Sequence, residues 1–316
     1  MLYMNDADFA NISISWEDTI GVISEAISAI FGNDYAQPIK PYLRFKKQTN
    51  RIIAMPAYVG GTIDMAGIKW IASFPENIKR NIPRASCITA LNDTDTGVPL
   101  AIFNTALISI IRTASVSGYV LKEYDAFKQK PNYNVGIIGF GPIGQHHLKM
   151  CQSVLKDKIN NIYLYDTRPI NAADAKACVC DSWQEVYEQA NIFITCTSSL
   201  ERYIDLPVSS DKLILDVSLR DFKEEALDSF TKPFIVDDWE EVNRENTDIE
   251  YYVKIGKMSK DEAISLSDLQ KMKMNRFYKE DDTVFFAPMG MGVFDIAIAN
   301  YYYEYAVKNK LGLSLD

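Results

Sequence analysis

The middle of the chain reads Asn134-Val-Gly-Ile-Ile-Gly139-Phe-Gly141-Pro-Ile-Gly144-Gln145. An apolar run typical of a buried strand ends there in a G-x-G-x-x-G turn, and residues 145–155 are compatible with a helix. A second strand follows, Asn161-Ile-Tyr-Leu-Tyr-Asp166, and it ends in a carboxylate 22 residues after Gly144. Strand, glycine turn, helix, strand and terminal acid together predict a dinucleotide-binding unit.

Each glycine of this turn has a separate physical role. Gly139 makes the tight turn, Gly141 lets the backbone approach a pyrophosphate, and Gly144 lets helix and strand pack closely. The phosphates are expected on the free N–H groups at the helix N-terminus. The glycine pattern alone also fits an ordinary tight turn, but the strands and the acid around it favour a nucleotide site.

The terminal acid indicates which nucleotide is bound. Asp166 can accept hydrogen bonds from the adenosine ribose hydroxyls, and its charge repels a 2′-phosphate, so NAD is favoured over NADP. Arg168 lies two residues further on and can pair with a phosphate. We favour the simpler interpretation of Arg168 as a solvated surface charge.

Bulk composition limits the classes of function. A chain of 316 residues is long enough for two domains, and its 47% apolar and 24% charged residues are ordinary for a soluble globular protein. The net charge of −9 argues against a nucleic-acid or anionic-membrane partner. The N-terminus does not resemble a signal peptide, and no apolar run approaches the length of a membrane span, so a cytoplasmic protein is predicted.

The cysteines and histidines argue against a metal site. Five scattered cysteines suggest reduced thiols. Cys178-Val-Cys180 resembles half a metal site, but the sequence holds no second pair, and its only histidines are His146 and His147. No metal is therefore predicted, and a Ser-His-Asp or Cys-His hydrolase is disfavoured.

The remaining pattern predicts an α/β fold. Residues 16–31 have helical apolar spacing, and several extended stretches follow, with Asp93-Thr-Asp-Thr-Gly97 as a hairpin turn. This first third is predicted to be strand-rich. A helix is expected over about 106–122 and a polar entry to the next domain over 125–132. Further strands alternate with helical segments, which is typical of a doubly wound parallel sheet; they are expected at 192–195, 213–216, 234–236 and 283–287. Residues 245–280 are predicted to be mostly helical, and a last apolar helix is expected over about 293–308.

Several basic residues stand in apolar surroundings. Lys69 lies inside an apolar strand, and Arg112 lies in an apolar helical segment. Arg44 and Arg84 each follow a proline-containing stretch. Taken singly, each has a simpler interpretation as a structural or solvated charge; Lys69, for example, fits an edge strand with its amine in water. Taken together, they suit a pocket for a substrate with several carboxylates, because guanidinium groups bind carboxylates in a bidentate manner.

An acid also follows the strand predicted at 213–216. In open α/β sheets ligands bind beyond the carboxyl ends of the strands, so Asp221 is placed to meet the nicotinamide end of a cofactor. The alternative is that Asp221 caps a helix over 223–227. On the sequence pattern alone, the cap is the favoured interpretation.

These motifs resemble a known family. Gly67-Ile-Lys69, Arg112-Thr113-Ala-x-x-Ser117, the glycine turn with Gln145, and Gly290-Met-Gly292 with Asp295 resemble the ornithine cyclodeaminase/mu-crystallin family over nearly the whole chain. The stretches at 38–44, 51–56, 236–245 and 288–291 resemble one branch of it, the N-(2-amino-2-carboxyethyl)-L-glutamate dehydrogenases of 2,3-diaminopropionate biosynthesis, which supply siderophore and antibiotic pathways.

The resemblance implies an architecture and residue roles. Residues 1–112 with 289–316 would form a strand-rich α+β domain for substrate binding and dimerisation, residues 113–288 a Rossmann NAD-binding domain, and the protein a homodimer. Arg44, Lys69 and Arg112 match positions that hold the substrate carboxylate, Asp221 matches the catalytic acid/base, and Lys69 is predicted to assist it. The predicted cofactor contacts are Thr113, Gly139, Gly141, Pro142, Ile143, Asp166, Thr195, Thr197 and Ser218.

One departure from the family pattern bears on the substrate. Cyclodeaminases have threonine after the proline where this chain has Pro83-Arg84. An arginine there would repel the distal amine of ornithine and suit a tricarboxylate. The implied reaction is NAD-dependent oxidative hydrolysis of N-(2-amino-2-carboxyethyl)-L-glutamate to 2,3-diaminopropionate and 2-oxoglutarate. The alternatives are an ornithine or lysine cyclodeaminase, a ketimine reductase, and a catalytically silent nucleotide- and ligand-binding protein like the mu-crystallins.

Overall fold

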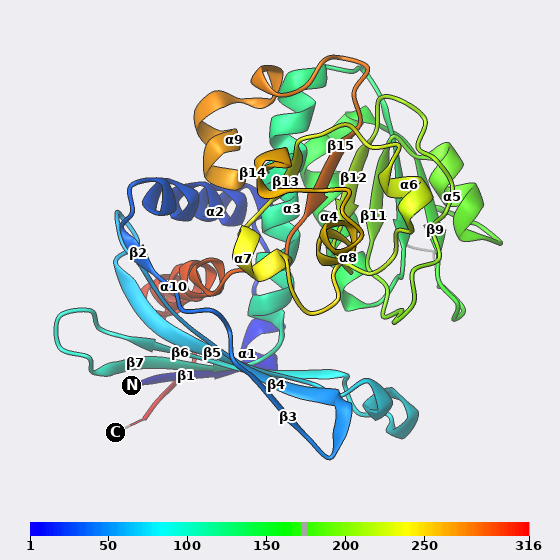
Figure 1. Cartoon of the computed structure of the whole chain (residues 1–316). Helices are drawn as coiled ribbons and strands as arrows, with labels where there is room; N and C mark the ends of the chain where they lie inside the picture. Colours follow the sequence, from blue (N-terminus) through cyan, green and yellow to red (C-terminus); the bar gives the residue numbers. More distant parts are fainter. Residues whose placement is uncertain (172–175, 316) are drawn as a thin grey trace. The chain divides into compact units, whose positions relative to one another are not determined.

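The computed structural model describes residues 1–171 and 176–315, and the chain divides into two compact units (Figure 1). The first unit comprises Met1–Val116 and Gly290–Asp316, and the second comprises Ser117–Met289. Helix α3 (Leu107–Lys128) contributes residues to both. It runs six residues beyond the predicted end at 122, so much of the expected polar entry at 125–132 is helical.

The first unit is built on a mostly antiparallel sheet. Its strand order is β16-β1-β7-β6-β5-β4-β2, with β3 paired to β4. The strands are β1 (Leu2–Asn5), β2 (Tyr35–Ala36), β3 (Tyr42–Phe45), β4 (Lys47–Val59), β5 (Met65–Ser73), β6 (Ala85–Asn92), β7 (Pro99–Asn104) and β16 (Leu313–Ser314). The predicted hairpin turn is confirmed, because Asp93 donates its N–H to the Val98 carbonyl between antiparallel β6 and β7.

Helices cover one face of this sheet. Helix α10 (Gly292–Asn309) packs against β4, β5 and α2 (Trp16–Phe31), as Figure 1 shows. The first half of α10 is apolar on nearly every side, which is typical of a helix enclosed by its neighbours. Side chains on the opposite face of the sheet are more open; Trp70 is 42% exposed and Ile88 is 44% exposed. The short elements α1 (Asp6–Phe9) and a 3₁₀ turn (Pro75–Arg80) complete this unit.

The second unit contains the predicted doubly wound sheet. All its pairings are parallel, in the order β10-β9-β8-β11-β12-β15-β13-β14. The strands are β8 (Tyr133–Ile138), β9 (Ile159–Tyr165), β10 (Cys178–Val179), β11 (Ile192–Thr195), β12 (Leu213–Asp216), β13 (Phe234–Val236), β14 (Ala263–Ser265) and β15 (Val284–Ala287). Strands β11, β12 and β15 are buried at every residue, as expected for a parallel sheet covered on both faces.

Apart from α4, which begins three residues before its predicted start at 145, the helices that lie wholly in this unit are short. They are α4 (Pro142–Leu155), α5 (Trp183–Gln189), α6 (Glu224–Leu227), α7 (Trp239–Val242), α8 (Asp248–Lys254) and α9 (Leu266–Met272). Residues 245–280, predicted to be mostly helical, include strand β14, which joins the edge of the sheet beside β13. Ser265 ends this strand and caps α9 by accepting the Asp268 N–H.

Strand β8 lies at the point where the strand order reverses. Strand β9 lies on one side of it and β11 on the other. In sheets of this kind ligands bind beyond the carboxyl ends of the strands at such a point. Within the described ranges, none of the helices combines the length and apolar character needed to cross a bilayer.

Candidate active site

The glycine turn after β8 has the backbone geometry that its sequence predicts. Gly139 has φ +83°, and a Cβ atom there would lie 2.4 Å from the Cys196 carbonyl oxygen. A Cβ atom on Gly144 would lie 2.2 Å from the Gly139 carbonyl oxygen. These contacts require glycine at both positions. Gly141 precedes Pro142 and Ile143 in the first turn of α4, and its nearest atom on the Cβ side is an Arg168 nitrogen at 3.7 Å.

The acid after β9 is joined to this turn. Asp166 accepts the Phe140 N–H through Oδ2 at 2.8 Å and the Arg168 N–H through Oδ1 at 2.9 Å. The Arg168 guanidinium also donates to both carboxylate oxygens at 3.2 Å. Burial opposes ionisation of Asp166, but the hydrogen bonds from Arg168 outweigh it and lower the pKa of the carboxyl. Arg168 is exposed, as expected for a surface charge, and it also forms an ion pair with Asp166.

Two further predicted residues contact Asp221, and a third lies at the end of the neighbouring strand. Thr197 donates its hydroxyl to Asp221 Oδ1 at 2.7 Å, and Ser218 donates its hydroxyl to Oδ2 at 2.5 Å. Thr197 also donates its backbone N–H to the Ser218 hydroxyl oxygen at 3.1 Å. Thr195 ends β11 in register with Asp216, the last residue of β12. The structure thus gathers Thr195, Thr197, Ser218 and Asp221 at the carboxyl ends of neighbouring strands.

The expectation that Asp221 caps a helix is wrong. Helix α6 begins at Glu224, its N-cap residue is Lys223, and no side chain caps it. The Asp221 carboxylate points instead to the two hydroxyls. The residue is fully buried, which a surface capping acid is not.

Two more buried acids lie around Asp221, and neither was predicted as a site residue. Asp216 accepts the Thr195 hydroxyl and the Leu219 N–H through Oδ1, and burial raises its pKa well above the usual range. Asp248 accepts the backbone N–H groups of Asp221 and Phe222 through Oδ2. Burial raises the pKa of Asp248 to about 6. Asp216 could have been recognised from the sequence, because it is a carboxylate at the end of an apolar strand. Asp248 could not, because it is one of several charged residues in its stretch.

A buried ion cluster stands in the first unit. Lys69 Nζ lies 2.6 Å from Asp295 Oδ2, and Arg112 Nε lies 3.0 Å from Asp295 Oδ1. Lys69 also donates to the Ser109 hydroxyl oxygen at 3.2 Å. Lys69 is 1% exposed, so the alternative of a lysine facing water is wrong. Its strand places it on the face that α10 covers.

The charge of this cluster is unbalanced. Two cations share one carboxylate, and burial lowers the pKa of Lys69 to about 8, with Asp295 opposing the shift and Arg112 adding to it. Because buried charges are stable only when paired, a site with surplus positive charge suits an anion. Gly290 has φ +88°, and a Cβ atom there would lie 2.7 Å from an Arg112 guanidinium nitrogen, so glycine keeps that side of the guanidinium clear.

Asp295 and Lys40 were not predicted as site residues. Asp295 stood in a family motif without an assigned role, and its position in a helix gave no sign that it pairs with Lys69. Lys40 is buried and donates to the Gly290 carbonyl oxygen at 2.7 Å. The feature that could have pointed to Lys40 is its position between two prolines, in a stretch that resembles the family branch.

The other predicted residues of the first unit are placed less centrally. Arg44 is half-buried on β3, donates to the Gln48 carbonyl oxygen at 2.9 Å and lies 5.4 Å from the centre of the Tyr42 ring. Arg84 is exposed in the loop before β6, outside the Lys69–Asp295–Arg112 cluster. Thr113 donates its hydroxyl to the Ser109 carbonyl oxygen, one helical turn earlier.

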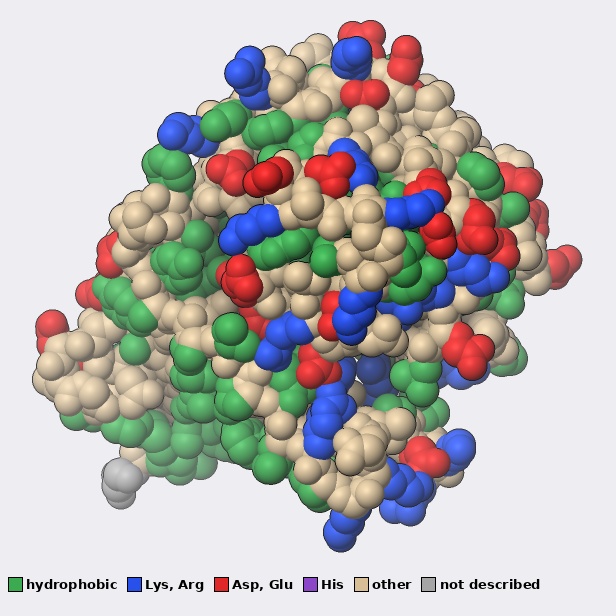
Figure 2. Space-filling model, in the orientation of Figure 1, with side chains coloured by type: hydrophobic (Ala, Val, Ile, Leu, Met, Phe, Trp, Pro, Cys, Tyr) green, Lys and Arg blue, Asp and Glu red, His purple; other side chains and the backbone are tan. Residues whose placement is uncertain are grey.

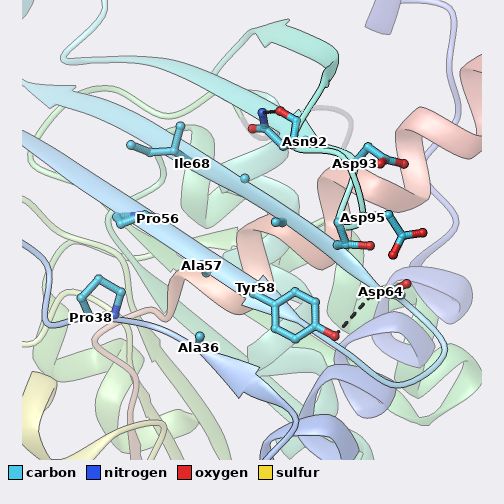
Figure 3. A pocket seen from close by; sticks show the side chains of 14 residues that line it. Ala36, Pro38, Pro56, Ala57, Tyr58, Asp64, Ile68, Asn92, Asp93 and Asp95 are labelled. Atoms are coloured by element: carbon cyan, nitrogen blue, oxygen red, sulfur yellow. Dashed lines mark hydrogen bonds between the residues drawn. The ribbon is translucent and has the colours of Figure 1, made fainter.

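A separate hollow lies on the other face of the same sheet. Its lining includes Pro38, Pro56, Tyr58 and Ile68, and Tyr58 donates to Asp64 Oδ1 at 3.3 Å (Figure 3). Neighbouring residues of a strand point to opposite faces, so Ile68 and Lys69 diverge. The hollow is therefore distinct from the buried ion cluster. Over the described ranges, no group of three or more His, Cys, Asp or Glu side chains is arranged to hold a metal ion.

Known proteins resemble this chain over its full length. The model of the ornithine cyclodeaminase/mu-crystallin family matches residues 4–310. An N-((2S)-2-amino-2-carboxyethyl)-L-glutamate dehydrogenase of Staphylococcus aureus is 33% identical, with 100% of this chain and 98% of the relative covered. A Delta(1)-pyrroline-2-carboxylate reductase of Bacillus cereus is 27% identical, with 88% and 89% covered.

Solved structures share the fold. A Thermococcus litoralis Delta(1)-pyrroline-2-carboxylate reductase in complex with NADH and L-proline superimposes with a TM-score of 0.89 at 24% identity, covering 100% of both chains. An archaeal alanine dehydrogenase dimer with bound NAD gives a TM-score of 0.83 at 21% identity, covering 100% of this chain and 99% of the other.

Proposed function

Because the chain belongs to the ornithine cyclodeaminase/mu-crystallin family, we propose that it oxidises N-(2-amino-2-carboxyethyl)-L-glutamate with NAD and hydrolyses the product to 2,3-diaminopropionate and 2-oxoglutarate. The observation that carries this proposal is the full-length relative at 33% identity, whose name states this substrate. The buried cation cluster supports it, because the substrate carries three carboxylates. The product would serve siderophore or antibiotic biosynthesis.

The second unit fits NAD. The turn from Gly139 to Ile143 would hold the pyrophosphate, since Gly141 leaves space and α4 presents unpaired N–H groups. Asp166 would accept the ribose hydroxyls. Thr195, Thr197 and Ser218 are proposed as the remaining contacts of this unit, and Thr113, which belongs to the first unit, is proposed as a further one. When bound, NAD supplies the oxidising power of the reaction by accepting a hydride.

The first unit would anchor the substrate. Lys69 and Arg112 are held by Asp295 in one orientation and leave surplus positive charge for a carboxylate. Arg44 and Arg84 are proposed to bind the other carboxylates. Fixing several carboxylates orients the α-hydrogen of the glutamate moiety for transfer, which is the main catalytic contribution of positioning.

Asp221 would manage the protons. Loss of hydride from the glutamate α-carbon and of a proton from the secondary amine leaves an imine. Asp221 takes a proton from water as the water oxygen attacks the imine carbon and passes it to the nitrogen, which gives a carbinolamine. It then takes the carbinolamine hydroxyl proton and passes it to the same nitrogen as the C–N bond breaks, which leaves the ketone of 2-oxoglutarate and the free amine. The balance is substrate, NAD⁺ and water to 2,3-diaminopropionate, 2-oxoglutarate, NADH and a proton. Thr197 and Ser218 hold the carboxylate during these transfers.

The test is direct. Purified protein with NAD and the synthetic conjugate should produce NADH, 2-oxoglutarate and 2,3-diaminopropionate in equal amounts. Asp221→Asn should bind NAD normally and lose about 10²–10⁴-fold in turnover. Full turnover by Asp221→Asn would remove Asp221 from the chemistry.

The alternative is that the protein is a cyclodeaminase or a ketimine reductase. The pyrroline-carboxylate reductases among its relatives support this alternative. Turnover of ornithine, lysine or a cyclic imine in place of the conjugate would establish it. Arg84→Thr gaining ornithine activity would show how narrow the difference is. A silent binding protein is disfavoured, because buried Lys69 and Asp221 are both present and oriented.

We also propose that the protein is a homodimer and that the first unit supplies the interface. The sheet face opposite Lys69 exposes large apolar side chains, among them Trp70, Ile88 and Leu43. Hydrophobic side chains gather on the lower left of the face shown in Figure 2. Several large apolar side chains exposed on one sheet face are typical of an association site.

A further inference from the structure

We propose that Asp248, held by Arg202, is the positioning residue that fixes the loop carrying Asp221. This inference rests on the catalytic role proposed for Asp221. Asp248 does not touch that carboxylate; it acts on the backbone that presents it. All the residues concerned belong to the second unit.

Asp248 is bonded to the loop at three points. Its Oδ2 accepts the N–H of Asp221 at 2.9 Å and the N–H of Phe222 at 3.0 Å. Its own N–H donates to the Leu219 carbonyl oxygen at 2.8 Å. Leu219 has φ +67°, a conformation that a non-glycine residue adopts only when its surroundings impose it. One bond from Asp248 holds this strained residue itself and two hold residues just after it, so together they keep the loop in its bent form.

Arg202 fixes Asp248 in turn. The Arg202 Nε donates to Asp248 Oδ1 at 2.6 Å, and another guanidinium nitrogen donates to the carbonyl oxygens of Asn246 and Thr247 at 2.9 and 2.7 Å. The guanidinium carbon lies 4.4 Å from the centre of the Tyr251 ring. Because the Asp248 side chain is fully buried, both of its oxygens are held by these donors with little freedom to rotate.

The consequence reaches the Asp221 carboxylate through geometry. With its N–H fixed by Asp248 and its carbonyl oxygen accepting from Tyr203 and Ile204, the Asp221 backbone has one position. Only from that position do its two oxygens meet the hydroxyls of Thr197 and Ser218. Phe222 anchors the far side, since its ring packs 5.6 Å from that of Phe285 in the core. Breaking the bonds between Asp248 and the loop would therefore misplace the Asp221 carboxylate without removing it.

The experiment compares Asp248→Asn and Arg202→Gln with the control Asp205→Asn. Asp205 is an exposed acid paired with Lys223 close to the same loop. For each protein, kcat and KM for the conjugate, the Kd for NAD, and hydrogen–deuterium exchange at the amides of residues 221 and 222 are measured. Both test variants should lose about 10–100-fold in kcat, as expected for a small misplacement of a catalytic group, with KM and Kd nearly unchanged. Their amides should exchange at least about tenfold faster.

The outcomes are separable. If Asp248→Asn keeps both wild-type kcat and wild-type exchange, the proposal is overturned. If Asp248→Asn does not fold, Arg202→Gln gives the decision by the same two measurements. If wild-type protein does not turn over the conjugate, the proposed function fails, and amide exchange alone decides whether Asp248 holds the loop. If Asp205→Asn loses as much kcat as Asp248→Asn, the proposal about Asp248 is also overturned, because the effect would then be general to the region.

Discussion

Lys69 is a single residue whose charge depends on its surroundings. Burial holds its pKa at about 8, compared with an ordinary value of 10.5, so the amine is charged below that pH and neutral above it. If it binds a substrate carboxylate, KM should rise above about pH 8, by up to about tenfold per pH unit. Initial rates over a pH series measure this. Lys69→Arg, which stays charged, should give a flat KM. A flat wild-type KM up to about pH 10 would contradict the prediction.

Asp295 is the counter-ion on which that cluster depends. Asp295→Asn would leave two buried cations without a negative partner, and breaking such a pair typically costs about 3–5 kcal/mol. Urea unfolding at neutral pH should report the loss. Glu76→Gln, which removes an exposed pair with Lys47, should change stability little. Wild-type stability in Asp295→Asn would show that the cations find other partners.

Asp166 tests cofactor choice at one position. Asp166→Ser removes the proposed acceptor for the ribose hydroxyls and releases Arg168, whose guanidinium can then pair with a 2′-phosphate. The KM for NAD should rise by about tenfold, and the ratio of NADP to NAD efficiency should rise as well. Steady-state kinetics with both cofactors measure the two effects. Adding Arg168→Ala should abolish the gain with NADP; a gain that persists would assign it elsewhere.

Single residues also mark the limit of what the sequence predicted. Lys69 was recognisable because a lysine inside an apolar strand is rare. Its orientation was undecided, because alternation permits either face and only the packing of α10 resolves the choice. Asp295 lies 226 residues from Lys69, and no local pattern joins them. Asp248 has a backbone role, and a side chain that binds backbone N–H groups leaves no motif.

The glycine turn after β8 is the element whose prediction was most complete. The turn requires a left-handed residue packed against the backbone that follows β11, and only glycine meets both needs. Gly139→Ala should cost about 1–3 kcal/mol in stability and weaken NAD binding. Gly97→Ala is the matched control, because Gly97 has φ +72° but open space around it. Denaturation and NAD titration of the two variants separate the cost of the left-handed backbone from the cost of the steric contact. Equal losses of stability in Gly139→Ala and Gly97→Ala would mean that the contact with Cys196 is unimportant.

Other elements were predicted in kind but not in extent. Long apolar strands and the helix α2 have strong periodicity, and these were located well. Residues 245–280 are charged and lack proline, which favours helix, yet a three-residue strand divides them. That strand exists because β13 offers an unpaired edge, which is a tertiary effect that local propensity does not contain.

At the scale of the whole molecule, the dimer proposal can be tested by charge. Trp70→Lys places a charge on an exposed apolar sheet face, where desolvating it in an interface is costly. The variant should be monomeric at micromolar concentration in light scattering, whereas the wild type should be dimeric. Leu200→Lys makes the same change from an apolar to a charged side chain at an exposed site of the second unit, and this variant should stay dimeric. A dimeric Trp70→Lys would place the interface on another surface.

Strand β5 carries Lys69 toward α10 and Trp70 toward the opposite side, one residue apart. A slip of one position anywhere upstream in this strand would exchange the two, turning the ammonium group outward and the indole inward. We therefore expect a single insertion within β5 to be more damaging than a substitution there, because it would displace the buried ammonium group and the exposed indole in one event.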